Sequence, residues 1–229
     1  MNVAIPDIDV SLARAETALA EGRPLVGTGF WSAVDQVKRH PDLIEEHADR
    51  IGVIDREAFE RWALLTVPIG MGTVLMVLAT VLGVVLVGLA YLPEDEILAT
   101  IVFFVGLGVL LVSTHGLAHL IVGRSSGMRF THWFIGKLVQ PQPGVKVDYA
   151  SYLRTPARSR AVMHAAGAVT TKIIPFLLIG AAIAAGLPNW AVWALPVIGV
   201  VAIVTDVAWS TKKSDWAKYR REMEFAQDP

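Results

Sequence analysis

The stretch of sequence that decides the fold is residues 98–122, LATIVFFVGLGVLLVSTHGLAHLIV. It is apolar and longer than the roughly 20 residues that a helix needs to cross a bilayer. Near its end, His115 and His119 stand on one face of such a helix, at the spacing that lets two imidazoles bind one zinc ion. Unpaired ionisable groups are rare at membrane depth, so this pair predicts a shared metal ion rather than two separate packing contacts.

The composition is that of an integral membrane protein. The chain has 229 residues, of which 54% are hydrophobic, and a mean hydropathy of +0.51, which is more apolar than soluble domains usually are. Cysteine is absent, so disulfides, thiolate metal sites and cysteine nucleophiles are excluded, and any metal must be held by His, Asp or Glu. The basic residues are spread over several segments rather than gathered in one groove, which argues against a nucleic-acid partner.

Four apolar stretches predict four membrane-spanning helices, so the lipid bilayer is the first expected partner. They cover residues 63–92, 98–122, 161–187 and 190–209. Residues 1–62 predict a polar helical segment with helices at Ser11–Glu21 and Phe30–Arg39 and a third that begins at Asp55 as its N-cap. Residues 130–152 predict a β-hairpin or re-entrant loop between the second and third spans. The predicted fold is therefore an all-α integral membrane protein with four transmembrane helices and a short β-hairpin or re-entrant loop between the second and third.

The positions of the charges predict how the chain lies in the cell membrane. Residues 1–62 carry seven Lys and Arg, residues 123–160 carry seven and residues 210–229 carry five, whereas the link 93–97 has three acids and no base. By the positive-inside rule, both termini, the loop 123–160 and the tail 213–229 are expected in the cytoplasm. Four spans with two termini on one side agree with this orientation.

Four potential metal ligands share one predicted depth. With a rise of about 1.5 Å per residue, His115 and His119 lie about 10 Å and 5 Å from the cytoplasmic end of the second span. His164 lies about 5 Å inside the third span, and Asp206 is similarly close to the inner end of the fourth. This coincidence predicts a metal site for which His115, His119, His164 and Asp206 are the candidate ligands. Four protein ligands would close the site and make it structural, whereas three would leave a position for water, with His164 then free to act as a base.

Simpler roles exist for three of the polar residues in the spans. His164 can be a helix-packing hydrogen-bond partner, and Asp206 can be an interfacial acid near the basic pair that follows it. Lys172 lies near the predicted midplane, two turns beyond His164 on the same face. It can pair with backbone carbonyls, or it can stabilise an anionic substrate group or a developing oxyanion, which would make Lys172 and His164 the catalytic candidates.

Four segments carry a resemblance to a known family. They are His115–Arg124 (HGLAHLIVGR), with GMRF at 127–130 and FIG at 134–136 after it, and Arg158–Gly167 (RSRAVMHAAG). The first three resemble the zinc-binding helix and following loop of the site-2 proteases, which are intramembrane zinc metalloproteases, and the last resembles the start of their next core helix. The resemblance implies a three-helix core formed by the last three spans, zinc as cofactor, Asp206 as third ligand, and a transmembrane or extended peptide as substrate. It also implies that Phe130–Gly136 offers a strand edge to that substrate.

The departures from the family pattern leave the activity open. Gly116 stands where the family has its catalytic glutamate, Ala168 stands where a proline is expected, and Val207 rather than Gly follows Asp206. Three functions are compatible with these residues: a metalloprotease with a displaced base, an inactive pseudoprotease that binds transmembrane segments, or a metal-dependent membrane enzyme that acts on a lipid or another small apolar substrate. If only the base is missing, Gly116→Glu is expected to restore the family arrangement.

Overall fold

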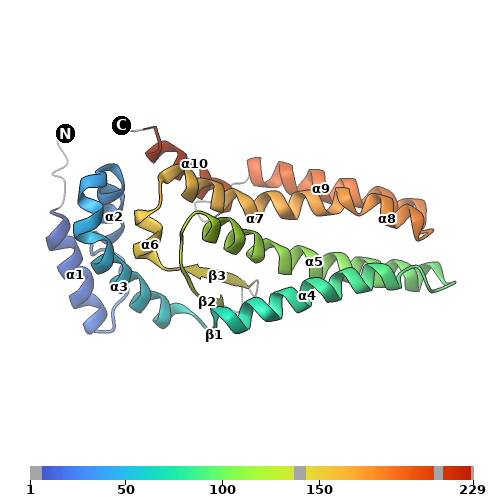
Figure 1. The fold of residues 1–229 in the computed structure, drawn as a ribbon, viewed down its shortest axis with the longest axis horizontal. Coiled ribbons are helices and arrows are strands. Elements are labelled where there is room, and N and C mark those ends of the chain that lie inside the picture. The colour runs from blue at the N-terminus through green and yellow to red at the C-terminus, as the bar shows by residue number, and fades with distance from the viewer. Residues whose placement is uncertain (1–6, 137–142, 209–213, 228–229) are drawn as a thin grey trace.

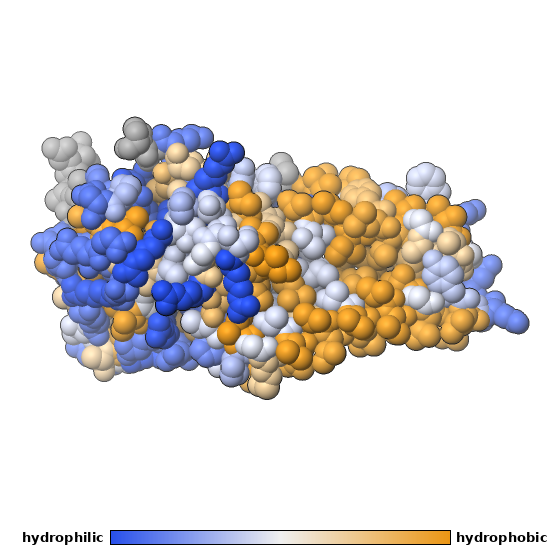
Figure 2. Space-filling view, in the orientation of Figure 1, coloured by the Kyte–Doolittle hydropathy of each residue, from blue (hydrophilic) through white to orange (hydrophobic). Residues whose placement is uncertain are grey.

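The computed structural model describes residues 7–136, 143–208 and 214–227. The molecule is elongated, with short helices and a small sheet at one end and long helices that run away from them (Figure 1). The first and last described helices, α1 and α10, both lie at the short-helix end. Figure 2 shows a polar surface at this end and an apolar surface over the long helices.

An N-terminal helical domain precedes the membrane region. It consists of α1 (Ile8–Ala20), α2 (Phe30–Arg39), a 3₁₀ turn (Pro41–Leu43) and α3 (Ile44–Trp62). Its core is formed by fully buried apolar side chains, among them Leu12, Phe30, Val34, Ile51 and Ile54. Helices of 10 to 19 residues are ordinary in globular proteins. They form here because each helix buries an apolar face against the others.

The prediction that Asp55 begins the third helix is wrong. Asp55 lies inside α3, is buried, and forms an ion pair with Lys146 of the sheet. Burial raises the pKa of the Asp55 carboxyl, and the ammonium group of Lys146 opposes that rise. The acid therefore joins α3 to the sheet instead of capping a helix.

Within the described residues, four helices are long and apolar enough to cross a membrane, as the sequence predicted. They are α4 (Ile69–Leu89), α5 (Glu96–Ser125), α7 (Ala157–Leu177) continued by α8 (Ile179–Ala184), and α9 (Asn189–Ala208). Their outward faces carry many exposed Val, Leu and Ile side chains, which produce the apolar surface in Figure 2. Such a surface suits lipid contact rather than water.

A three-stranded antiparallel sheet lies where the sequence predicted a hairpin or re-entrant loop. Its strands are β1 (Leu65–Pro68), β2 (Phe130–Ile135) and β3 (Gly144–Val147), in the order β1-β2-β3. The β1 residues were assigned to the first span from their apolar character, but Leu65 pairs with Ile135 and Pro68 with His132. Because β2 has a partner on both sides, the prediction that Phe130–Gly136 offers a free edge is wrong.

Helix α7 is the central helix of the membrane region, because it contacts several of the other helices. It contacts α5 on one side and α9 on another, and it also contacts α10 (Asp215–Phe225), the C-terminal helix. A short helix, α6 (Tyr149–Arg154), joins β3 to α7 and packs against α3. The amino-terminal half of α7 is therefore the place where spans, sheet and C-terminal helix meet.

Candidate metal centre

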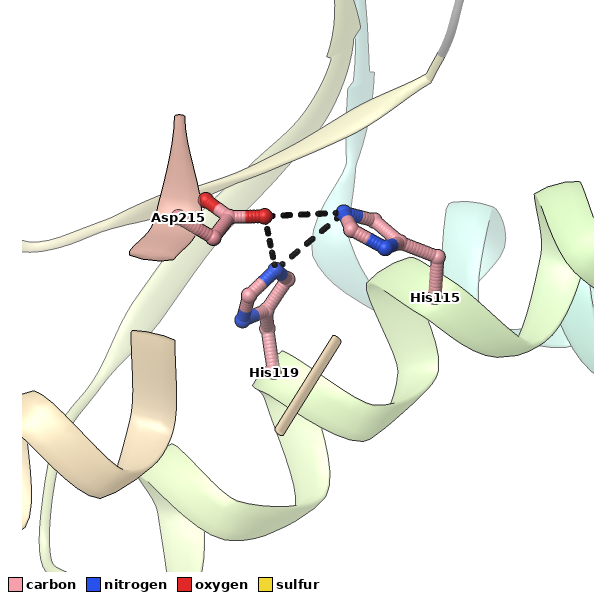
Figure 3. Close-up of side chains that lie close together, drawn as sticks. All are labelled: His115, His119 and Asp215. Atoms are coloured by element: carbon pink, nitrogen blue, oxygen red, sulfur yellow. Dashed lines mark hydrogen bonds and ion pairs between the residues drawn. The ribbon is translucent and has the colours of Figure 1, made fainter. Parts of the chain in front are cut away.

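His115, His119 and Asp215 form a compact group in which one atom of each side chain faces the other two (Figure 3). The Oδ2 atom of Asp215 lies 3.2 Å from Nε2 of His115 and 3.2 Å from Nε2 of His119. The two Nε2 atoms lie 3.3 Å apart. The histidines come from neighbouring turns of α5, and the carboxylate comes from the first residue of α10.

These separations fit a zinc ion. With bonds of about 2.0–2.1 Å in a tetrahedral site, two ligand atoms stand roughly 3.3–3.4 Å apart. The three distances of 3.2, 3.2 and 3.3 Å are close to that value. Two imidazoles and a carboxylate are also a common zinc donor set, and no further His, Asp or Glu joins the group within the described residues. Three protein ligands would leave one position of the metal open.

A hydrogen bond on the far side of the His119 ring orients its other nitrogen toward the centre. Its Nδ1 lies 2.7 Å from the backbone carbonyl oxygen of Met163 on α7, so Nδ1 carries the proton and donates it to that oxygen. The lone pair of Nε2 is then directed to the centre, as in zinc sites where a carbonyl fixes the histidine tautomer. Gly167 leaves room for the ring, because a Cβ atom there would lie 2.3 Å from Nε2 of His119.

Asp215 is oriented by its own helix. The side chain of Ser214 caps α10 by accepting a hydrogen bond from the amide of Ala217 at 3.2 Å. The Oδ1 atom of Asp215 accepts a hydrogen bond from Nζ of Lys218 at 3.1 Å, which leaves Oδ2 for the histidines. Burial alone would raise the pKa of Asp215, but the two imidazoles beside its carboxylate and the charge of Lys218 outweigh burial and hold the pKa well below its usual range. The group is therefore a carboxylate, the form that binds metal.

Asp206 does not reach the histidines, which corrects the prediction that it is the third ligand. It forms an ion pair with Lys172, whose Nζ also donates to the carbonyl oxygen of Ala168 at 2.9 Å. Lys172 is eight residues beyond His164 on α7, or about 12 Å further along the helix. The antiparallel helices α7 and α9 are thus staggered so that Asp206 lies beyond the depth of the metal centre. Apolar length alone could not reveal this stagger.

The two catalytic candidates predicted from sequence occupy different places. The Nε2 atom of His164 lies 2.9 Å from the hydroxyl oxygen of Tyr152, and the imidazole lines the cavity at the metal centre without joining the ligand group. Lys172 is engaged by Asp206 and is not among the residues that line this cavity. His164 therefore remains close to the centre, whereas Lys172 serves the contact between α7 and α9.

The space beside Gly116, where the resemblance would place a glutamate side chain, is filled by an aromatic ring. A Cβ atom at Gly116 would lie 2.4 Å from Cζ3 of Trp133, and a Cβ atom at Gly72 on α4 would lie 2.4 Å from Cδ1 of the same ring. The indole of Trp133 thus occupies a slot between α4 and α5, and its Nε1 donates to the hydroxyl of Thr73 at 3.1 Å. The expectation that Gly116→Glu alone restores the family arrangement therefore meets a steric obstacle.

A cavity of about 1010 Å³ opens onto the metal centre. Most of its lining is apolar, and it includes α5, α7, α9, the sheet and α3. Among the residues that line it are Trp62, Leu111, Val112, Phe130, Phe134, Val145, Val147, Ile198 and Ala202. A volume of this size accepts several side chains of a bound molecule. The centre therefore faces a space suited to an apolar ligand of considerable size.

Two of the three residues of the candidate centre, His115 and His119, were predictable from the sequence. Ser214-Asp215 carries the signature of a helix start, since Ser caps helices and an acid favours the first turn. Nothing local indicates that this helix returns to the spans. Comparison of the chain with protein-family models, with curated proteins and with solved structures found no match.

Proposed function

We propose that the protein is a membrane-embedded zinc protein related to the site-2 proteases, which cleaves a peptide bond in an apolar polypeptide segment that enters the cavity. The observation that carries this proposal is the set of three donor atoms at tetrahedral separations, facing an apolar cavity of about 1010 Å³. Zinc in such a site lowers the pKa of a bound water and polarises a carbonyl group.

Strand β3 is the element that fits an extended substrate. Gly144, Val145 and Val147 line the cavity, and within the described residues β3 pairs with β2 alone. An extended segment can add to a free strand edge through main-chain hydrogen bonds, while its side chains occupy the neighbouring pockets. This assigns to β3 the docking role that the sequence suggested for Phe130–Gly136.

His164 is the proton acceptor that we assign in place of a glutamate. It lines the cavity, and the hydroxyl of Tyr152 fixes its ring at 2.9 Å. General acid–base catalysis typically contributes about 10²–10⁴-fold to the rate. Replacement of His164 by Ala is therefore expected to lower cleavage about 10²–10⁴-fold, to below detection, while zinc stays bound.

The second candidate function is that of a pseudoprotease, and the indole of Trp133 favours it. The ring fills the place that the family uses for its base, so proton transfer from that side is blocked. In this case the cavity binds a transmembrane or extended segment and releases it uncut. Zinc would then hold α5 and α10 together.

Metal analysis tests the site that both functions share. Purified protein is expected to contain about one zinc per chain, the stoichiometry of a mononuclear centre. His119→Ala and Asp215→Ala should lose it during purification, although Asp215→Ala keeps the two histidines and with them a weaker affinity that can still be titrated. Glu224→Ala, on the exposed face of α10, is the matched control and should retain it. Equal zinc content in the wild type and Asp215→Ala would contradict the centre.

A cleavage assay separates the two functions. Tagged single-span proteins are reconstituted with the zinc-loaded protein in vesicles, and products are followed by size. The proposed protease cuts at least one of them and stops when His119→Ala or His164→Ala is used. Capture of an uncut segment by photo-crosslinking from Val145, together with inert wild type, would support the pseudoprotease and overturn the protease.

A further inference from the structure

The C-terminal helix α10 carries a second buried polar contact besides the one at the metal centre. Glu222 is fully buried, with an exposed side-chain fraction of 0%, and both of its carboxylate oxygens are bound. Oε1 lies 2.6 Å from Nζ of Lys38 on α2, and Oε2 lies 2.7 Å from Nε of Arg160 on α7. The two cations are almost equally buried, at 1% and 3%.

The triad of Lys38, Glu222 and Arg160 also contacts neighbouring backbone carbonyls and an aromatic ring. The guanidinium of Arg160 also donates to the carbonyl oxygens of Leu153 at 3.2 Å and Thr155 at 2.8 Å. The ring of Tyr152 lies 5.2 Å from Nζ of Lys38 and 5.4 Å from Cζ of Arg160. The same Tyr152 binds His164 through its hydroxyl. The triad is therefore contiguous with the wall of the metal cavity.

Asp215 and Glu222 stand on one helix, seven residues apart, which is about two turns or 10.5 Å. This separation brings both side chains to the same face of α10, the one that packs on α7. The two histidines are held within α5, whereas Asp215 belongs to a separate short helix. The place of the third ligand therefore depends on what holds α10.

We infer that Glu222 is a positioning residue for the metal ligand Asp215, and that its contact with Lys38 ties the metal centre to the N-terminal helical domain. This inference rests on the proposed zinc site but on neither proposed activity. The physical reason is effective concentration: α10 presents the Asp215 carboxylate to the ion bound by the histidines, and a loosened α10 presents it less often. The N-terminal helical domain contributes no metal ligand, yet through Lys38 it raises the zinc affinity.

Zinc affinity, measured by competition with a chelator in detergent, tests the inference. Glu222→Gln is expected to weaken binding by about 10–100-fold, the usual effect of removing a residue that supports a metal ligand. Glu224→Gln is the matched control, because the same substitution is made two residues away on the exposed face of α10. It should bind zinc like the wild type.

A double-mutant cycle separates positioning from general stabilisation. If Glu222 acts through Asp215, adding Glu222→Gln to Asp215→Ala costs no further affinity, since the ligand that it positions is already gone. A role in overall stability alone would leave the affinity of the folded Glu222→Gln protein unchanged, or would weaken Asp215→Ala by the same factor as the wild type. Either result would overturn the inference.

Lys38→Met keeps the test valid if Glu222→Gln does not fold. It leaves Glu222 with Arg160 as a one-to-one ion pair, so no buried carboxylate loses its last partner. Folding is checked by size-exclusion chromatography and circular dichroism. The folded Lys38→Met variant should bind zinc more weakly than the wild type. In the Asp215→Ala background, Lys38→Met should cause no further weakening. Wild-type affinity in the Lys38→Met variant would refute the inference. Absence of zinc from the wild type would instead refute the metal centre itself.

Discussion

Glycines around the metal centre determine which side chains can approach it. Because Gly116 and Gly72 lack side chains, the indole of Trp133 fits between α4 and α5. Gly167 in the same way leaves room for the His119 ring. Each of these glycines lies against an aromatic or imidazole ring closely enough that a single added carbon would overlap it. The centre is thus shaped as much by missing Cβ atoms as by its ligands.

Gly116→Ala is expected to destabilise the protein by about 1–3 kcal/mol, the usual cost of overpacking a filled interior. The reason is the 2.4 Å separation between the new Cβ atom and the Trp133 ring, which α4 confines on its other side. Gly108→Ala is the matched control on the same helix, since its Cβ would meet nothing within 4 Å. It should be neutral or stabilising by up to about 1 kcal/mol. Thermal unfolding in detergent measures both, and an equally stable Gly116→Ala protein would contradict the packing described.

The residues of the candidate metal centre divide into two that a sequence can reveal and one that it cannot. His115 and His119 are separated by one turn of a single helix, so their proximity follows from local geometry. Asp206 and Asp215 are both acids near the end of the last span, and the choice between them depends on how α9 and α10 lie against α7. That is a property of tertiary packing, which one sequence does not report.

At the scale of elements, α10 shows how much a short polar helix can depend on one carboxylate. Burial alone would raise the pKa of Glu222, but Lys38 and Arg160 outweigh burial and lower it below the ordinary value of 4.5. A lowered folded pKa means that the unfolded chain binds the proton more readily. The stabilisation from Glu222 is therefore complete above pH 4.5 and is lost as the pH falls from there through the folded pKa.

The unfolding temperature of the wild type should therefore fall as the pH is lowered below about 4.5, and Glu222→Gln should show a shallower fall because it lacks this titration. At neutral pH the same variant should be less stable by about 3–5 kcal/mol, since two buried cations lose their shared partner. Glu224→Gln should keep the wild-type slope. Thermal scans in detergent at a series of pH values provide the comparison, and parallel curves for wild type and Glu222→Gln would count against the ion triad.

The other elements were predictable to different degrees. The long apolar runs identify α4, α5, α7 and α9, because length and hydropathy are properties of each segment alone. Strand β1 was assigned to the first span because Leu65 and Val67 are apolar and directly precede α4. Its pairing with β2 joins segments about 70 residues apart, and apolar character does not distinguish a short strand from the start of a membrane helix.

At the scale of the whole molecule, the charge distribution still predicts both termini in the cytoplasm. The natural absence of cysteine makes this easy to check, because one introduced thiol is the only one present. Glu94→Cys, in the exposed link between α4 and α5, should react with an impermeant maleimide on intact cells. Arg14→Cys, exposed on α1, should react only after the membrane is permeabilised. Labelling of Arg14→Cys on intact cells would reverse the orientation.

The ion pair between Lys172 and Asp206 has a consequence for how the chain enters the bilayer. A lone lysine or aspartate at the centre of a membrane helix costs about 2.5–3.5 kcal/mol during insertion by the translocon. Helix α7 leaves the ribosome before α9, so Lys172 has no partner until Asp206 is synthesised 34 residues later. The two helices are therefore expected to leave the translocon together, as a hairpin. Membrane integration of α7 would then depend on a residue that the cell has not yet translated when α7 first enters the translocon.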